Sequence, residues 1–164
     1  MIDVDVSRAV NQQGDLFRFE YSGCPEMPDL AFDKPLRLQA EYSVSDETVR
    51  LIGTMETVLE VACTRCLDEV PFAVECDFDE TFTKDGADDS YTYNGNIVEL
   101  DKMVYDYLML SLPQKILCGD DCKGLCPQCG ANRNREACDC SNQVSDDENN
   151  PFNKLKDLFK DGEV

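Results

Sequence analysis

Hydrophobic and polar positions alternate through most of residues 17–82. The hydrophobic positions are Phe17, Phe19 and Tyr21, then Leu36, Leu38, Ala40, Tyr42 and Val44, then Val49, Leu51, Met55, Leu59 and Val61, and finally Val70, Phe72, Val74, Cys76, Phe78 and Phe82. A period of two over this length is typical of half-buried antiparallel strands. The short link "VSDETV" between two of these runs favours hairpin pairing. The pattern therefore predicts a curled antiparallel sheet or an open, barrel-like β domain.

The periodicity changes in "IVELDKMVYDYLMLSLP", residues 97–113. Here Leu100, Met103, Val104, Tyr107 and Leu108 are spaced as on one face of a helix, and Pro113 ends it. We expect this hydrophobic face to pack on the sheet. The predicted fold class is α+β, with one helix packed on an antiparallel sheet.

Three polar or amphipathic stretches complete the chain. Residues 77–96, "DFDETFTKDGADDSYTYNGN", are acidic and rich in turn residues, which predicts a solvated loop or a bulged edge. Residues 141–150 form an acidic linker. "NPFNKLKDLFKDG" then predicts a short amphipathic helix, with Asn150 as N-cap and Pro151 at its first position, that docks on its own domain or binds a partner. The predicted division is a β domain over 1–113, a Cys-rich segment over 114–140, and a linker with a C-terminal helix over 141–164.

The chain has ten cysteines and no histidine. Eight of them form closely spaced pairs: Cys63 with Cys66, Cys118 with Cys122, Cys126 with Cys129, and Cys138 with Cys140. A C-x2-C turn directs two thiolates at one metal ion, and four thiolates complete a tetrahedral site. "CTRCLDE" lies where one predicted strand turns back into the next, which is the position of a zinc knuckle. The remaining two differ: Cys76 belongs to the hydrophobic face of its strand, and Cys24 is an isolated loop thiol.

Two groupings of the eight thiols satisfy a four-ligand rule. Cys63 and Cys66 pair either with Cys118 and Cys122 or with Cys138 and Cys140. We favour the first grouping, because Cys126, Cys129, Cys138 and Cys140 can then close on one ion locally. An iron–sulfur cluster would also accept four thiolates, but two structural zinc ions are the expected content. Sites saturated by protein ligands leave no position for a catalytic water, so we expect no enzyme activity and no small-molecule substrate.

The formal net charge is −19, from 34 acidic and 15 basic residues. Such a charge repels phosphate backbones and attracts basic partners, although it can also serve solubility alone. The candidate partner-binding residues are Asp77, Asp79, Glu80, Asp85, Asp88 and Asp89. The N-terminal residues lack the features of a signal peptide, and no apolar run is long enough to span a membrane, so a cytoplasmic location is expected.

The motifs "CTRCLDEV", "IVELDKMVYDYLMLSLP", "CGDDCKGLCPQCGANRNREACDC" and "NPFNKLKDLF" together resemble the YceD family of large ribosomal RNA subunit accumulation proteins. The resemblance implies a cytoplasmic bacterial or plastid protein that is needed for normal levels of 23S ribosomal RNA. In this family the gene often lies beside that of a small zinc-binding ribosomal protein, and some members lack the second cysteine cluster. The family brings no established reaction.

The sequence therefore favours a non-enzymatic factor for large-subunit biogenesis that binds a basic ribosomal protein or an assembly factor. One alternative is an RNA-binding zinc module, in which Arg133 and Arg135 contact phosphates while Lys123 adds a nearby positive charge. The other is a thiol redox switch using one C-x2-C pair. Neither pair lies in a βαβ pattern, which disfavours a thioredoxin-type site.

Overall fold

The computed structural model describes residues 1–86 and 90–140. The chain divides into two compact units, residues 1–122 and 123–164. The predicted domain boundaries at residues 113 and 140 remain predictions. The predicted C-terminal helix, with Asn150 and Pro151, lies outside the described residues.

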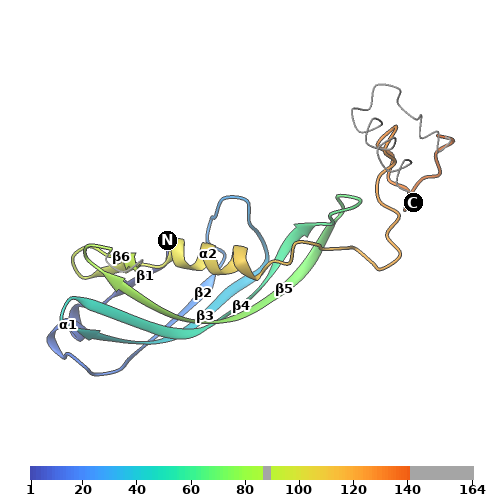
Figure 1. Cartoon of the computed structure of the whole chain (residues 1–164). Coiled ribbons are helices and arrows are strands. Elements are labelled where there is room, and N and C mark those ends of the chain that lie inside the picture. The colour runs from blue at the N-terminus through green and yellow to red at the C-terminus, as the bar shows by residue number, and fades with distance from the viewer. Residues whose placement is uncertain (87–89, 141–164) are drawn as a thin grey trace, which may run out of the picture. The chain divides into compact units, whose positions relative to one another are not determined.

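A five-stranded sheet in the order β2-β3-β4-β5-β6 dominates the first unit (Figure 1). The first four strands are antiparallel neighbours, and β6 pairs in parallel with the end of β5. Their bounds are Phe17–Gly23 (β2), Ala31–Ser45 (β3), Thr48–Ala62 (β4), Glu69–Thr83 (β5) and Tyr91–Thr92 (β6). Among the described residues the sheet is open, since β2 and β6 stand at opposite ends of the strand order. The predicted α+β class is confirmed, as an open sheet and not a closed barrel.

One face of the sheet forms the core, as the period-two pattern predicts. Leu38, Leu51, Met55 and Phe82 are almost completely buried on this face. Residues on the other face are exposed and largely charged. Glu56 there accepts a hydrogen bond from Arg37, with 3.3 Å between Nη1 and Oε1.

Helix α2, Asp101–Ser111, covers the core face with its buried Met103, Val104 and Leu108. The Tyr107 ring meets Phe78 edge-on, with 6.1 Å between ring centroids. The helix begins later than the segment predicted from the sequence, because Ile97–Glu99 form strand β7, with Val98 buried between two exposed residues. β7 pairs with β1, Asp3–Asp5, and the short helix α1, Ser7–Asn11, follows β1; neither was predicted.

Two predictions overlap at residues 77–82: the alternation assigns Phe78 and Phe82 to a strand, and the acidic composition indicates a solvated loop or a bulged edge. The strand is confirmed, and the solvated loop is wrong for residues 77–83. Residues 77–83 continue β5, with Phe78 and Phe82 buried on the core face and Asp77 and Asp79 exposed. The alternating phenylalanines therefore determine the local structure despite the acidic composition. No helix within residues 1–86 and 90–140 has the length and apolar character needed to cross a membrane.

Candidate metal centres

Cluster A consists of Cys63, Cys66, Cys118 and Cys122, and lies within the first unit. The first two follow the end of β4, at the tip of the β4–β5 hairpin, and the last two follow α2. The Ile116 carbonyl joins the two segments by accepting hydrogen bonds from the N–H and the hydroxyl of Thr64, at 2.8 and 3.0 Å. The cluster therefore fastens the segment after the helix to the hairpin tip.

The sulfur positions in cluster A suit one tetrahedral ion. All four Sγ atoms lie within 4.8 Å of one another, with 3.8 Å between Cys63 and Cys122 and 3.5 Å between Cys66 and Cys118. A tetrahedron with metal–sulfur bonds of about 2.3 Å has sulfur–sulfur edges of about 3.8 Å, far longer than the roughly 2 Å of a disulfide. Cys63, Cys66 and Cys122 are nearly inaccessible to solvent, and Leu117 packs against them.

Cluster B consists of Cys126, Cys129, Cys138 and Cys140, whose Sγ atoms also lie within 4.8 Å of one another. It belongs entirely to the second unit. Backbone bonds within that unit position it, including one of 3.0 Å from the N–H of Arg133 to the carbonyl of Gly124. The structure thus groups the eight paired cysteines as the favoured grouping predicts. Each group could hold a metal ion.

Both clusters begin with the same six-residue turn. In cluster A the N–H of Cys63 is donated to the carbonyl of Asp68, and the N–H of Leu67 to the carbonyl of Cys63, at 2.8 and 2.9 Å. Cluster B repeats these two bonds, from Cys126 to Ala131 and from Gly130 to Cys126, at the same two distances.

The fifth residue of each turn has a left-handed backbone, with a φ of 62° at Leu67 and 75° at Gly130. Glycine adopts this conformation without penalty, whereas Leu67 has backbone strain there because of its Cβ. Leu67 is also 63% exposed, so its side chain gains little from burial. Sequence reasoning missed Leu67. Aligning "CTRCLD" with "CPQCGA" would have found it.

The thiols of each cluster differ in acidity. Burial alone would raise the pKa of Cys63, but backbone N–H groups, first those of Arg65 and Cys66, lower the pKa to about 6. The N–H groups of Cys129 and Gln128 likewise lower the pKa of Cys126 to about 6.

Other thiols in the two clusters resist ionisation. The neighbouring Cys129 raises the pKa of Cys140 to about 12, and Cys122 raises the pKa of Cys118. Each cluster therefore ionises one thiol readily and resists further ionisation until a cation supplies positive charge.

The acidic residues predicted to bind a partner do not form one uniform group. Asp77 and Asp85 are exposed, and Asp79 accepts two hydrogen bonds from Arg50, at 2.9 and 2.7 Å. Glu80 is half-buried and accepts a hydrogen bond of 2.6 Å from the Tyr107 hydroxyl. Asp88 and Asp89 lie outside the described residues. Asp79 and Glu80 are thus held by hydrogen bonds from Arg50 and Tyr107.

Comparison with known proteins shows which family the chain matches. The family model described as "Large ribosomal RNA subunit accumulation protein YceD" matches residues 51–159. The match includes the hairpin tip, α2 and both cysteine clusters. No solved structure matches the chain.

Curated relatives match over part of their length. A chloroplastic protein of Arabidopsis thaliana, named a large ribosomal RNA subunit accumulation protein YCED homolog, is 24% identical over 172 residues, which cover 84% of this chain and 54% of that protein. An uncharacterized protein of Mycobacterium tuberculosis is 32% identical over 111 residues, which cover 62% of this chain and 54% of that protein. The chain spans about half the length of the curated relatives it matches.

Proposed function

The chain belongs to the YceD family of large ribosomal RNA subunit accumulation proteins, and from that membership we propose that it is a non-enzymatic factor for accumulation of 23S ribosomal RNA and biogenesis of the large ribosomal subunit. It acts by binding a basic ribosomal protein or an assembly factor in the cytoplasm. The observation that carries the proposal is the family match over more than half of the chain, which includes both thiol clusters.

Each thiol cluster holds one zinc ion in this proposal, through Cys63, Cys66, Cys118 and Cys122 in cluster A and through Cys126, Cys129, Cys138 and Cys140 in cluster B. Zinc prefers four thiolates in tetrahedral sites, and the sulfur separations in cluster A match its bond lengths. Four protein ligands fill the coordination sphere. The ions therefore fix loops and leave no position for a substrate.

The acidic surface is the proposed contact for the partner, with Asp77, Asp79, Glu80, Asp85, Asp88 and Asp89 as the candidate residues. A net charge of −19 accelerates encounter with a basic protein and opposes contact with a phosphate backbone. Asp77 and Asp85 are exposed members of this set, whereas Asp79 is bound by Arg50.

A pulldown with two arms tests the partner class. The tagged chain is recovered from cells with and without RNase treatment, and the co-purifying proteins are identified. We expect basic proteins of the large subunit to remain in both arms. Loss of those proteins after RNase treatment would favour the RNA-binding alternative, in which Arg133 and Arg135 contact phosphates.

A complementation assay tests the cellular role. In a strain that lacks its own copy of the gene, the wild-type chain should restore the ratio of 23S to 16S ribosomal RNA. The double variant Asp77→Asn with Asp85→Asn should restore it less well, while Asp15→Asn with Glu26→Gln, which removes the same charge from exposed positions elsewhere, should restore it fully. Full rescue by the first variant at normal expression would refute the acidic contact.

A further inference from the structure

We propose that the open edge of β5, residues 69–77, binds an extended basic segment of a partner protein by adding that segment to the sheet as a further strand. This inference deepens the proposed function and rests on it for the identity of the partner as a basic ribosomal protein or assembly factor.

Between residues 69 and 81, β5 has a neighbouring strand along only one of its two edges in the described part of the chain. It pairs with β4 from Glu69 to Phe82, but with β6 only at Phe82 and Thr83. Within the described part of the chain, no backbone hydrogen bond reaches the other edge between Glu69 and Thr81. Figure 1 shows β5 at the margin of the long strands.

The odd-numbered residues of β5 direct their backbone groups toward this open edge. Pro71 has no N–H to donate, and proline is accepted within a strand where that position faces away from the ladder. Thr83 agrees, because its carbonyl accepts a hydrogen bond of 3.0 Å from the N–H of Tyr93, on the side of β6 and not of β4. N–H and C=O groups alternate between the two edges of an antiparallel strand. Ala73, Glu75 and Asp77 therefore present their N–H and C=O groups for pairing.

Edges of this length are usually protected by charged side chains, especially lysine, by proline, by bulges or by being short. β5 has 15 residues. Pro71 protects the start of its open edge, and Glu75 and Asp77 supply negative charge farther along, but no lysine precedes Lys84. The other edge strand, β2, has seven residues and exposes both Arg18 and Glu20. The β5 edge is thus the longer one, and its charge has a single sign.

The charge of the β5 edge selects a basic occupant. Among the described residues, Glu75 and Asp77 have no ion-pair partner, whereas Asp79 is held by Arg50. Side chains directly opposite across a ladder interact by about 0.2–1 kcal/mol. A strand that places lysine or arginine at alternate positions would set them beside Glu75 and Asp77.

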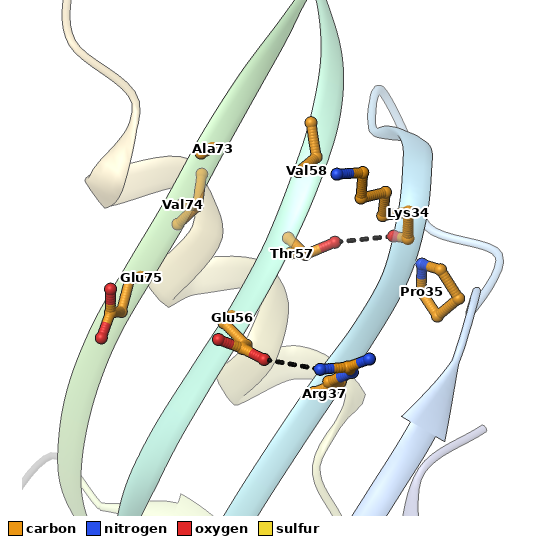
Figure 2. A pocket seen from close by; sticks show the side chains of 9 residues that line it. All are labelled: Lys34, Pro35, Arg37, Glu56, Thr57, Val58, Ala73, Val74 and Glu75. Carbon is orange, nitrogen blue, oxygen red and sulfur yellow. Dashed lines mark hydrogen bonds and ion pairs between the residues drawn. The ribbon is translucent and has the colours of Figure 1, made fainter.

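The neighbouring surface can accept apolar atoms. Figure 2 shows a hollow on the exposed face of the sheet, lined by Ala73 and Glu75 of β5, Val58 of β4, and Lys34 and Pro35 of β3. The small side chain of Ala73 leaves space above Val58. The residue of the added strand opposite Ala73 lies on the same face as the basic positions, so the aliphatic part of a lysine side chain there can cover this hollow.

Two labelled peptides of equal charge test strand addition on the full, zinc-loaded chain. One alternates lysine with valine, and the other alternates lysine with proline, which cannot donate the ladder bonds. Fluorescence anisotropy gives the affinities, and amide exchange followed by NMR reports on Ala73, Glu75 and Asp77. We expect the lysine–valine peptide to bind at least tenfold more tightly and to slow exchange at those amides.

Two variants separate the backbone from the charge. Ala73→Pro removes one N–H from the open edge, as Pro71 already does, and should weaken the lysine–valine peptide about fivefold while Ala73→Ser leaves it unchanged. Glu75→Lys with Asp77→Lys should weaken both peptides at least tenfold. Asp15→Lys with Glu26→Lys makes the same change in net charge at exposed positions outside β5, and should have a smaller effect.

Several outcomes would overturn the inference. Equal affinity for the two peptides, or unchanged amide exchange in β5, would reduce the contact to charge alone. Protection of the same amides by a uridine oligonucleotide would make the edge an RNA contact, and protection by self-association of the free chain would make it a dimer interface. Failure of the proposed function is distinguishable, because it would alter 23S ribosomal RNA rescue and the pulldown but not peptide binding in vitro.

Discussion

Removing one thiol from cluster A should destabilise the sheet, whereas removing one from cluster B should not. Cys63→Ser breaks cluster A, which joins the β4–β5 hairpin tip to the segment that follows α2. Cys129→Ser breaks cluster B, whose four thiols lie within residues 126–140 of the second unit. We expect the first variant to destabilise the β domain and the second to unfold only its own loop.

The size of the difference follows from the loops that the clusters close. Cluster A joins residues 52 positions apart, such as Cys66 and Cys118. The loop-entropy relation for a cross-link then gives about 4 kcal/mol of stabilisation. For a domain of this size that corresponds to a fall in Tm of roughly 15 °C for Cys63→Ser. Cluster B closes a much shorter loop, worth about 3 kcal/mol, which is confined to its own unit.

Thermal unfolding followed by far-ultraviolet circular dichroism measures the sheet directly, and elemental analysis of each variant counts the zinc lost. Cys24→Ser is the matched control, because Cys24 is exposed and belongs to neither cluster. Equal losses of Tm in Cys63→Ser and Cys129→Ser would refute the assignment of cluster A to the sheet. So would an unchanged Tm in Cys63→Ser after complete loss of one zinc.

Three further outcomes are expected. Chain purified without chelator should contain two zinc ions by elemental analysis, and one ion, or iron with visible absorbance, would contradict the two-cluster assignment. Leu67→Gly should leave the Tm equal or raise it, because glycine removes about 1 kcal/mol of left-handed strain at little loss of buried surface; a marked fall would mean that the leucine side chain stabilises the turn. Gly53→Ala should destabilise the sheet by several kcal/mol in denaturant titration, because the added methyl group would overlap the Gln39 carbonyl and the Ala40 Cα of β3; wild-type stability would show that the strands can separate there.

The sequence predicted the long strands well because each has one buried face. In β4, for example, Leu51 and Met55 are buried while Glu56 is exposed. This alternation can be recognised in the sequence even where the positions of the turns cannot. The same rule explains the error at residues 77–83. The acidic composition indicated a loop, yet Phe78 and Phe82 continued the alternation and joined the core.

The elements that escaped prediction are those whose stability comes from distant partners. β1 and β7 are three residues each and pair across most of the unit's length in sequence, so neither carries a long enough local pattern. The grouping of the thiols was predictable because short spacings limit which sulfurs can meet. The strain at Leu67 has no signal in its own segment, because leucine does not indicate a left-handed backbone; only Gly130, at the same position of the second turn, indicates it.

Cluster A also bears on the open edge of β5, because the two features lie on one hairpin. The strand begins at Glu69, only three residues after Cys66. Glu69 pairs with Ala62, the last residue of β4. An edge strand with one neighbour frays from its end, since each backbone pair there is held from one side only. Fixing Cys63 and Cys66 to the segment after α2 anchors that end. The carbonyl and N–H groups of Ala73, Glu75 and Asp77 are thereby held in an extended line. Less conformational entropy of β5 is then lost when a partner strand pairs with them.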